Sequence, residues 1–178
     1  MARVVAVARA VGAHPSYPDR EGFGRRTIAM APGELEAAVR EQCGRLAALA
    51  RVQYVKPHGA LYHDARVNPA LAAAVIAGAR AALGDGFAVI GPPTGALRDA
   101  AVAAGLRYLR EGFADRATRP DGTLVPRGEP GALVTDPARA AARARELARS
   151  GACDTVCVHG DSPGSVAIAR AVREALAP

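Results

Sequence analysis

Short apolar runs alternate with longer amphipathic stretches along the 178 residues of the chain. The runs span residues 10–13, 52–55, 87–90, 106–109 and 155–158. They are apolar on both faces, which is typical of strands covered on both sides of a parallel sheet. Each run therefore predicts a buried strand.

The stretches between the runs carry signals for helix starts. A capping side chain, or a proline at the first helical position, presets the entry of the backbone into a helix. These signals stand at Ala31-Pro32, Asn68-Pro69, Thr94-Gly95, Asp136-Pro137 and Ser162-Pro163, and Gly105 and Gly151 are placed as helix stops. Because repeated strand-helix units imply parallel pairing, the pattern predicts an α/β fold, either a barrel or an open doubly wound sheet. No linker divides the chain, so residues 1–178 are predicted to form a single domain.

Composition restricts the classes of function. Neither an apolar leader nor an apolar stretch of about 18 residues occurs, so we predict no membrane contact. The three cysteines form an odd set without paired spacing, which indicates a reduced, cytoplasmic protein in which Cys153 and Cys157 are buried. The net charge of +6 raises the question of nucleic acid. The arginines are scattered along predicted helices instead of forming a basic run with aromatics, so we predict no nucleic-acid partner.

One basic residue stands apart from the others. Of the 23 basic residues, only Lys56 is a lysine, and it follows an apolar run in Val55-Lys56-Pro57-His58-Gly59. A guanidinium stays protonated, whereas an ammonium is a compact charge whose pKa can be tuned by burial. Lys56 is therefore a candidate for chemistry.

Other reactive side chains also follow the predicted strands. In parallel α/β folds the carboxyl ends of the strands open onto the ligand site. The residues at these ends are His14, Lys56, His58, Glu111, Asp115, Arg116, His159 and Asp161. We expect them to meet on one rim of the sheet as an active site.

Two loops are longer than a plain connection requires. Residues 13–25 combine proline, glycine and opposite charges, a composition that holds a backbone rigid. Residues 111–135 contain Asp121-Gly122, a predicted hairpin turn, and are expected to fold over the site as a lid. The chain has no Walker-type, dinucleotide-binding or nucleophile-elbow motif.

Five ordered blocks span nearly the whole chain. They are Gly12-Ala13-His14-Pro15-Ser16-Tyr17-Pro18-Asp19-Arg20, Val55-Lys56-Pro57-His58-Gly59-Ala60-Leu61-Tyr62, Glu111-Gly112-Phe113-Ala114-Asp115-Arg116, Leu124-Val125-Pro126-Arg127 and Val158-His159-Gly160-Asp161. Together they resemble the LamB/YcsF family, which provides the A subunit of bacterial 5-oxoprolinase. The resemblance implies a barrel related to sugar deacetylases. It also implies ATP-dependent opening of the 5-oxoproline lactam to L-glutamate, together with partner subunits B and C.

The sequence departs from the family pattern at its start. Members of the family usually open with Asp-Leu-Asn-x-Asp-x-Gly-Glu and then Gly-Phe-His-Ala-Gly-Asp, and neither segment has a counterpart here. The expected fold is therefore a barrel that is incomplete at its N-terminal side. A barrel lacking strands leaves an exposed sheet edge, so we expect pairing with another chain, a homo-oligomer being one such arrangement.

Opening a lactam requires a polarised or phosphorylated carbonyl oxygen, an activated water and a proton for the departing nitrogen. We expect Lys56 to stabilise the charge on oxygen or phosphate, and His58 or His159 to move protons. Asp161 or Asp115 is expected to orient an imidazole or to act as a base. The residues predicted to bind the substrate or ATP are His14, Arg20, Glu111, Arg116 and Arg127.

Two other classes of function stay open at this point. A metal-dependent deacetylase-like hydrolase would need a carboxylate and two imidazoles around a divalent cation. A non-catalytic protein of the same fold would bind a small anion at the strand ends. The sequence leaves the need for a metal undecided.

Overall fold

The structure is a computed structural model that describes residues 9–119, 121–162 and 164–177. Two compact units follow one another along the chain, the first ending at Leu109 and the second beginning at Arg110. The single domain expected over residues 1–178 stays a prediction.

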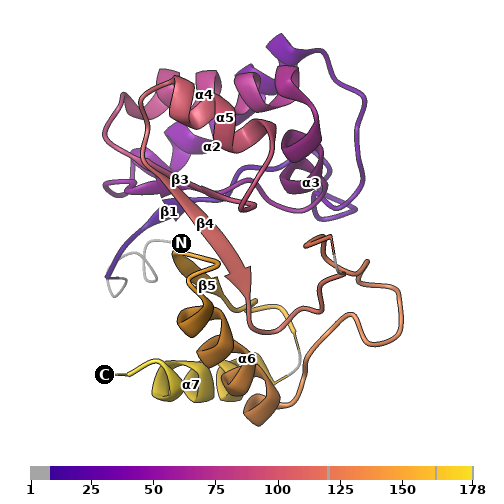
Figure 1. The fold of residues 1–178 in the computed structure, drawn as a ribbon. Coiled ribbons are helices and arrows are strands. Elements are labelled where there is room, and N and C mark those ends of the chain that lie inside the picture. Colours follow the sequence, from indigo (N-terminus) through magenta and orange to yellow (C-terminus); the bar gives the residue numbers. More distant parts are fainter. Residues whose placement is uncertain (1–8, 120, 163, 178) are drawn as a thin grey trace. The chain divides into compact units, whose positions relative to one another are not determined.

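Over residues 9–109, the described part of the first unit, the chain forms three short parallel strands and four helices (Figure 1). The strands are β1 (Gly12–Ala13), β2 (Tyr54–Val55) and β3 (Ala88–Gly91), and the helices are α2 (Pro32–Ala47), α3 (Ala60–Val67), α4 (Pro69–Leu83) and α5 (Ala96–Ala103). β1 pairs with β2 and β2 pairs with β3, so their order in space follows their order in the chain. Sequential parallel pairing is the arrangement of a (β/α) barrel, whereas a doubly wound sheet reverses its order at a switch point.

Three helices begin where capping chemistry predicts. The Asn68 side chain accepts hydrogen bonds from the amides of Ala70 (3.0 Å) and Leu71 at the start of α4. In the same way, the Asp136 side chain accepts a hydrogen bond from the Arg139 amide at 2.7 Å, at the start of helix α6 (Pro137–Ser150). Each bond satisfies an amide that has no partner within its own helix. The start of α2 at Pro32 is also confirmed.

The sequence pattern missed helix α3. It begins directly after Gly59, which has a φ of +62° and offers no capping side chain. No N-terminal signal therefore marked this helix. A helix start was also expected at Ser162-Pro163, but α7 begins at Ser165. Pro163 itself lies outside the described residues.

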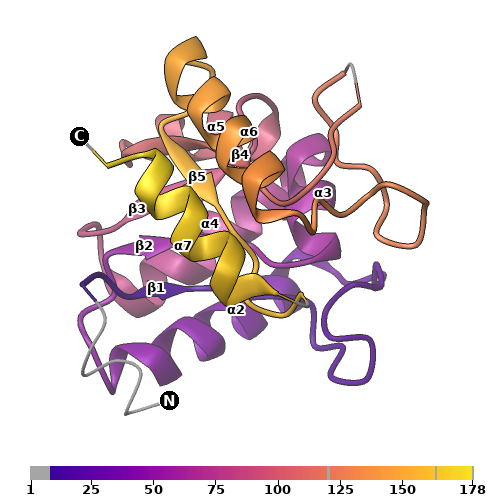
Figure 2. The ribbon, with the colours of Figure 1, turned by 90° about the horizontal axis from the view of Figure 1, so that it is seen from below.

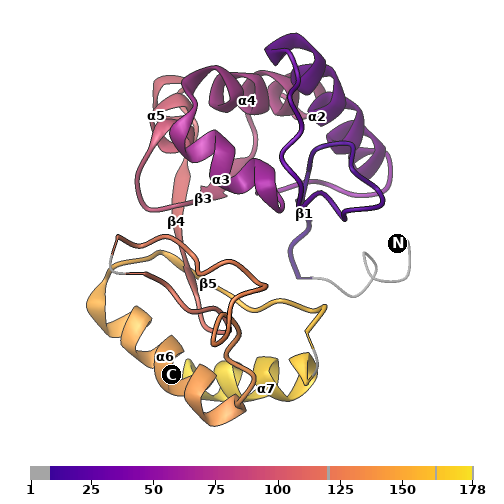
Figure 3. The same cartoon turned by 90° about the vertical axis from the view of Figure 1, so that its right-hand side faces the viewer.

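The core of the first unit lies where helix α4 packs against α2. Leu35 and Val39 of α2 and Val75 of α4 are fully buried. Gly78 allows this packing to be close, because a Cβ atom at that position would lie 2.4 Å from the Glu36 carbonyl oxygen. Small residues on one helix let the backbone of the other approach. Figures 1 and 3 show these helices gathered on one side of the strands.

The described residues of the second unit form one parallel strand pair and two helices. Strand β4 (Tyr108–Phe113), whose first two residues belong to the first unit, pairs with β5 (Thr155–Cys157), and the chain also forms α6 (Pro137–Ser150) and α7 (Ser165–Ala175). Figures 2 and 3 show α6 and α7 side by side on one side of this pair. A small apolar core joins them, formed by Ala114, Ala140, Ala144, Ile168 and Val172. Together with the first unit, this confirms the predicted α/β class with repeated strand-helix units and parallel strands.

The hairpin predicted in the segment between β4 and α6 is present. Thr118 pairs antiparallel with Leu124, and the Asp121 side chain accepts from the Thr123 amide at 2.9 Å. Gly122 has a φ of +80°, a conformation that glycine adopts without steric cost. The expected role of this segment as a lid stays a prediction.

The cysteines only partly follow expectation. All three are free thiols, and Cys43 is buried, but Cys153 and Cys157 are only half-buried. The prediction that both of these are buried was wrong, because Cys153 precedes and Cys157 ends the short strand β5, whose residues are all only half-buried.

Candidate functional site

In the first unit, a parallel hydrogen-bond ladder extends past the ends of β1 and β2. The Lys56 amide donates to the Ala13 carbonyl at 2.9 Å, and the His58 amide donates to the Pro15 carbonyl at 2.8 Å. Pro15 and Pro57 are fully buried and anchor the two segments. This ladder places the residues after the two strands side by side, as expected for carboxyl ends of parallel strands.

The ladder brings two imidazole rings into direct contact. His58 Nδ1 lies 3.0 Å from His14 Nε2, and the rings meet edge to face with centroids 4.7 Å apart. At the outer ends of the pair, His14 Nδ1 lies 2.6 Å from the Lys56 carbonyl oxygen and His58 Nε2 lies 2.8 Å from the Phe23 carbonyl oxygen. His14, His58 and Lys56, predicted from the sequence to share a site, are thus neighbours. We call His14 and His58 the histidine pair.

Asp19 organises the loop that follows His14. Its buried carboxylate accepts from the Gly22 amide at 2.9 Å and from the amide and guanidinium of Arg26. The hydrogen bonds from Arg26 lower the pKa of the Asp19 carboxyl to about 2. The carboxylate therefore stays charged at neutral pH and holds the turn closed.

The same loop rests on the turn between β2 and α3. Phe23 has a φ of +57°, which is uncommon for a bulky residue, and its carbonyl faces His58. The next carbonyl, that of Gly24, accepts from the Ala60 amide at 3.0 Å. The loop and the turn are in such close contact that a Cβ atom on Gly59 would lie 2.2 Å from the Gly24 carbonyl oxygen. Backbone in a rarely populated conformation is commonly held at functional sites.

A second anchor of this loop was missed by the sequence reasoning. The buried Tyr17 hydroxyl donates to the Asp64 carboxylate of α3 at 2.9 Å. Burial, followed by this hydrogen bond, raises the pKa of Tyr17, so the hydroxyl remains a donor. Sequence spacing gave no signal for this contact, because Tyr17 and Asp64 lie 47 residues apart in the chain.

In the second unit, Asp115 holds His159. Both residues follow the β4–β5 pair, where Phe113 lies opposite Cys157. Asp115 is 2% exposed and accepts from the His159 amide at 2.7 Å and from His159 Nδ1 at 2.9 Å. The His159 ring also stacks on Phe113, with centroids 5.8 Å apart.

This geometry fixes the tautomer of His159. A carboxylate only accepts hydrogen bonds, so Nδ1 carries the proton and the neutral ring keeps its lone pair on Nε2. Burial alone raises the pKa of the Asp115 carboxyl, but the hydrogen bonds from His159 outweigh it and hold that pKa below its ordinary value. An imidazole oriented by a buried carboxylate is suited to act as a general base.

The residues predicted to bind anions lie in different surroundings. Arg116 is buried and donates to the carbonyls of Val125 (2.6 Å) and Ala132, so it organises the segment between β4 and α6. Arg127 approaches Asp161 at 3.4 Å, within the second unit. Glu111 is buried on β4, and Arg20 is exposed in the loop after β1. Their binding roles stay predictions.

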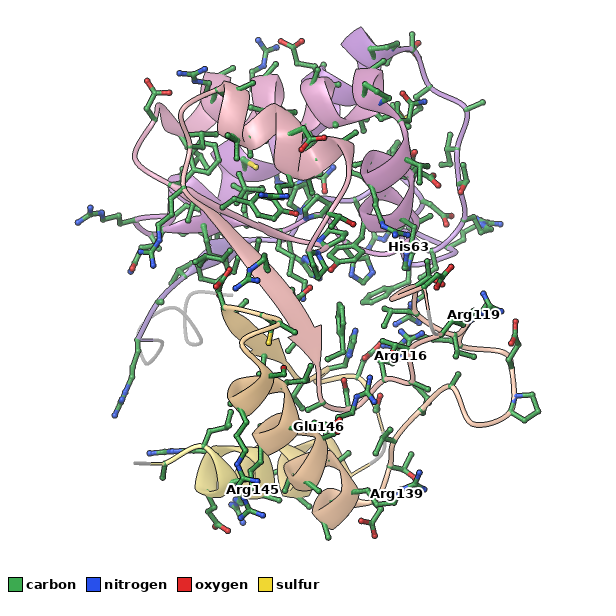
Figure 4. The ribbon with its side chains drawn as sticks, in the orientation of Figure 1. His63, Arg116, Arg119, Arg139, Arg145 and Glu146 are labelled. Carbon is green, nitrogen blue, oxygen red and sulfur yellow. The ribbon has the colours of Figure 1, made fainter. Side chains whose placement is uncertain are left out.

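Arginines also cover the surface of the second unit. Figure 4 shows Arg119 on the segment that follows β4, and Arg139 and Arg145 on α6. Arg119 forms an ion pair with Glu129 at 2.9 Å. These side chains come from separate elements, which agrees with the scattered basic residues seen in the sequence.

A metal centre requires several donor side chains around one point. Among the described residues, no group of three or more His, Cys, Asp or Glu side chains is arranged to hold a metal ion. The metal-dependent hydrolase considered from the sequence therefore stays a prediction, and the described residues provide no set of ligands for its cation. Nor does any described helix combine the length and apolar character needed to cross a membrane.

Comparison with known proteins gives a consistent result. The profile of the LamB/YcsF family matches residues 1–178. A protein of Methylococcus capsulatus, named as the A subunit of 5-oxoprolinase, is 46% identical over 97% of this chain and 74% of its own length. A protein of the same name from Streptomyces griseus is 49% identical, over 93% of this chain and 73% of its own length.

A solved structure shares the fold. The lactam utilization protein of Thermus thermophilus superposes with a TM-score of 0.84 at 39% identity, over 94% of this chain and 73% of that protein. The residues that carried the resemblance, above all the blocks around His14, Lys56, Asp115 and His159, are those that the structure places at the strand ends. On these grounds the chain belongs to the LamB/YcsF family.

Proposed function

We propose that this chain is the A component of a 5-oxoprolinase and takes part in the ATP-dependent opening of 5-oxoproline to L-glutamate. Relatives that are 46% and 49% identical carry the name of that component, and the structural neighbour is named for lactam utilization. A component with such a name has other subunits as partners, and we propose that these are subunits B and C. ATP is a substrate of the reaction in this proposal.

The observation that carries the proposal is the Asp115–His159 pair. A lactam resists water because amide resonance lowers the electrophilicity of its carbonyl carbon. We propose that ATP activates the carbonyl oxygen and that His159 Nε2 takes a proton from the attacking water. Asp115, at 2.9 Å from Nδ1, stabilises the imidazolium that forms.

Other predicted residues keep narrower roles in the proposal. Lys56 is our candidate for the charge that stabilises negative oxygen on the lactam or the transferred phosphate. Arg20 and Arg127 are our candidates for contacts with the phosphates or the substrate carboxylate, since a guanidinium fork matches paired oxygens.

The test is a reconstituted complex of the chain with subunits B and C, assayed for glutamate and ADP formed from 5-oxoproline and ATP. His159→Gln should lower kcat by about 100- to 10,000-fold, the contribution typical of a positioned general base. His63→Gln, at an exposed position of α3, is the matched control and should leave the rate unchanged. A complex that forms no glutamate, or a His159→Gln complex of normal rate, would contradict the proposal.

A further inference from the structure

The histidine pair has a proton count that its hydrogen bonds dictate. Both outer nitrogens, His14 Nδ1 and His58 Nε2, face main-chain carbonyl oxygens at 2.6 and 2.8 Å. A carbonyl oxygen only accepts, so each outer nitrogen must carry a proton. In a neutral imidazole the other nitrogen then bears a lone pair.

If both rings were neutral, two lone pairs would face each other across the 3.0 Å between His14 Nε2 and His58 Nδ1. If both rings were fully protonated, two N–H groups would face each other there. Only one additional proton, held between the two inner nitrogens, makes all three hydrogen bonds at once. The pair then has three protons on four nitrogens and one net positive charge.

We propose that His14 and His58 form a single proton-holding unit, an imidazole–imidazolium pair that serves as the general acid of the reaction. The assignment rests on the proposed function. The pair carries one surplus proton, which is what a general acid supplies to a leaving group.

The step balances as a proton transfer. The departing lactam nitrogen replaces the Phe23 carbonyl as acceptor and takes the proton from His58 Nε2. The inner proton then belongs to His58 Nδ1 and is donated to His14 Nε2, while His14 Nδ1 stays bonded to the Lys56 carbonyl. The pair passes from one positive charge to none, and a proton from solvent restores it. His14 touches no substrate in this scheme and is a positioning residue.

The loop conformation supports this use of the Phe23 carbonyl. Phe23 is held at a φ of +57°, and the Asp19 turn on one side and the Gly24–Ala60 hydrogen bond on the other fix the backbone around it. The Phe23 ring also lies edge-on to the His58 ring, with centroids 5.3 Å apart. The carbonyl is thus aimed at His58 by the loop and fixes which nitrogen carries the proton.

Several charged groups belong to the elements around the pair. They are Arg20, Glu21, Arg25, Arg26 and Asp19 of the loop, Lys56 after β2, and His63, Asp64 and Arg66 of α3. Asp19 is bound to Arg26 and Asp64 to Tyr17, so these two carboxylates have partners of their own. Arg25 lies over the Phe23 ring at 5.2 Å.

The first test observes the protons directly by NMR of the full chain labelled with ¹⁵N-histidine. The chain has four histidines, so His63→Gln and His159→Gln complete the assignment. We expect one strongly deshielded N–H proton that disappears in both His14→Gln and His58→Gln and persists in His63→Gln. Two rings that titrate independently, with no such proton, would overturn the proposal. If one variant fails to fold, the other and the unsubstituted chain still decide the question.

The second test uses the reconstituted complex. A glutamine at position 14 can accept from His58 Nδ1 and donate to the Lys56 carbonyl, so it preserves the contacts but holds no exchangeable charge. His14→Gln should therefore lower kcat about 10- to 100-fold with little change in KM, a part of what a positioned acid contributes. It should also shift the alkaline limb of the pH–rate profile. An unchanged kcat and profile would overturn the role of the pair, whereas a wild-type complex without turnover would contradict the proposed function and leave the NMR result standing.

Discussion

The contact between α2 and α4 permits a sharp prediction from two glycines. Gly44 and Gly78 both lie inside helices of the first unit, and alanine is the better helix former at either position by about 0.5–1 kcal/mol. A Cβ atom on Gly44 would meet nothing within 4 Å. On Gly78 it would lie 2.4 Å from the Glu36 carbonyl oxygen and 3.0 Å from Val39 Cβ.

The gain in helix propensity is common to both substitutions. The difference between the free energies of unfolding of the two variants therefore measures the cost of the close contact at Gly78. Relieving the contact at Gly78 requires the two helices to move apart, and overpacking of this kind costs about 1–3 kcal/mol. Gly44→Ala should therefore raise the free energy of unfolding by about 0.5–1 kcal/mol, and Gly78→Ala should lie about 1–3 kcal/mol below it.

The assay is urea unfolding of the full chain followed by far-ultraviolet circular dichroism. A change in the midpoint with an unchanged slope reports stability itself, whereas a changed slope reports altered compactness. Equal midpoints for the two variants, or a higher midpoint for Gly78→Ala, would refute the view that backbone contact at Gly78 sets the distance between α2 and α4.

Three further predictions concern the loop, the turn and the core. The pKa of Asp19 is lowered from 3.8 to about 2, so its contribution to stability is present above pH 3.8 and is lost as the pH falls toward 2; Asp19→Asn should remove this part of the acid limb in a pH series of urea midpoints. Gly59→Ala should destabilise the chain by about 1–3 kcal/mol, because its φ of +62° is strained for alanine, and an unchanged midpoint would count against the loop packing. Burial raises the pKa of Cys43 to about 11, so Cys43 should react with iodoacetamide more slowly than Cys153 in the folded chain, as mass spectrometry of the labelled peptides can show.

Much of the fold could be predicted from local signals. The positions of β1, β2, β3 and β5 followed from apolar runs, but β4 (Tyr108–Phe113) extends four residues past the predicted run 106–109, so Glu111 lies on the strand and not after it. The starts of α4 and α6 followed from Asn68 and Asp136, because a capping side chain acts within its own turn. Helix α3 could not be predicted in this way. Its start depends on Gly59 fitting against the Gly24 carbonyl, a contact between segments far apart in the chain.

The candidate site, like the fold, could be predicted only in part from the sequence. The sequence identified His14, Lys56 and His58 as neighbours after strands, and the ladder past β1 and β2 agrees. It left open whether Asp115 or Asp161 orients an imidazole, and the structure pairs Asp115 with His159 and Asp161 with Arg127. The expectation that all these residues line one rim stays a prediction.

The sequence by itself determined which residue types stand at the ends of the strands, because hydrophobic periodicity and helix caps are local properties of the chain. Only the tertiary structure decided which nitrogens of His14, His58 and His159 carry a proton. That depends on the acceptor facing it, the Lys56 and Phe23 carbonyls for the histidine pair and the Asp115 carboxylate for His159. Such acceptors come from distant parts of the chain, and a hydrogen bond exists only where folding brings its two atoms within about 3 Å.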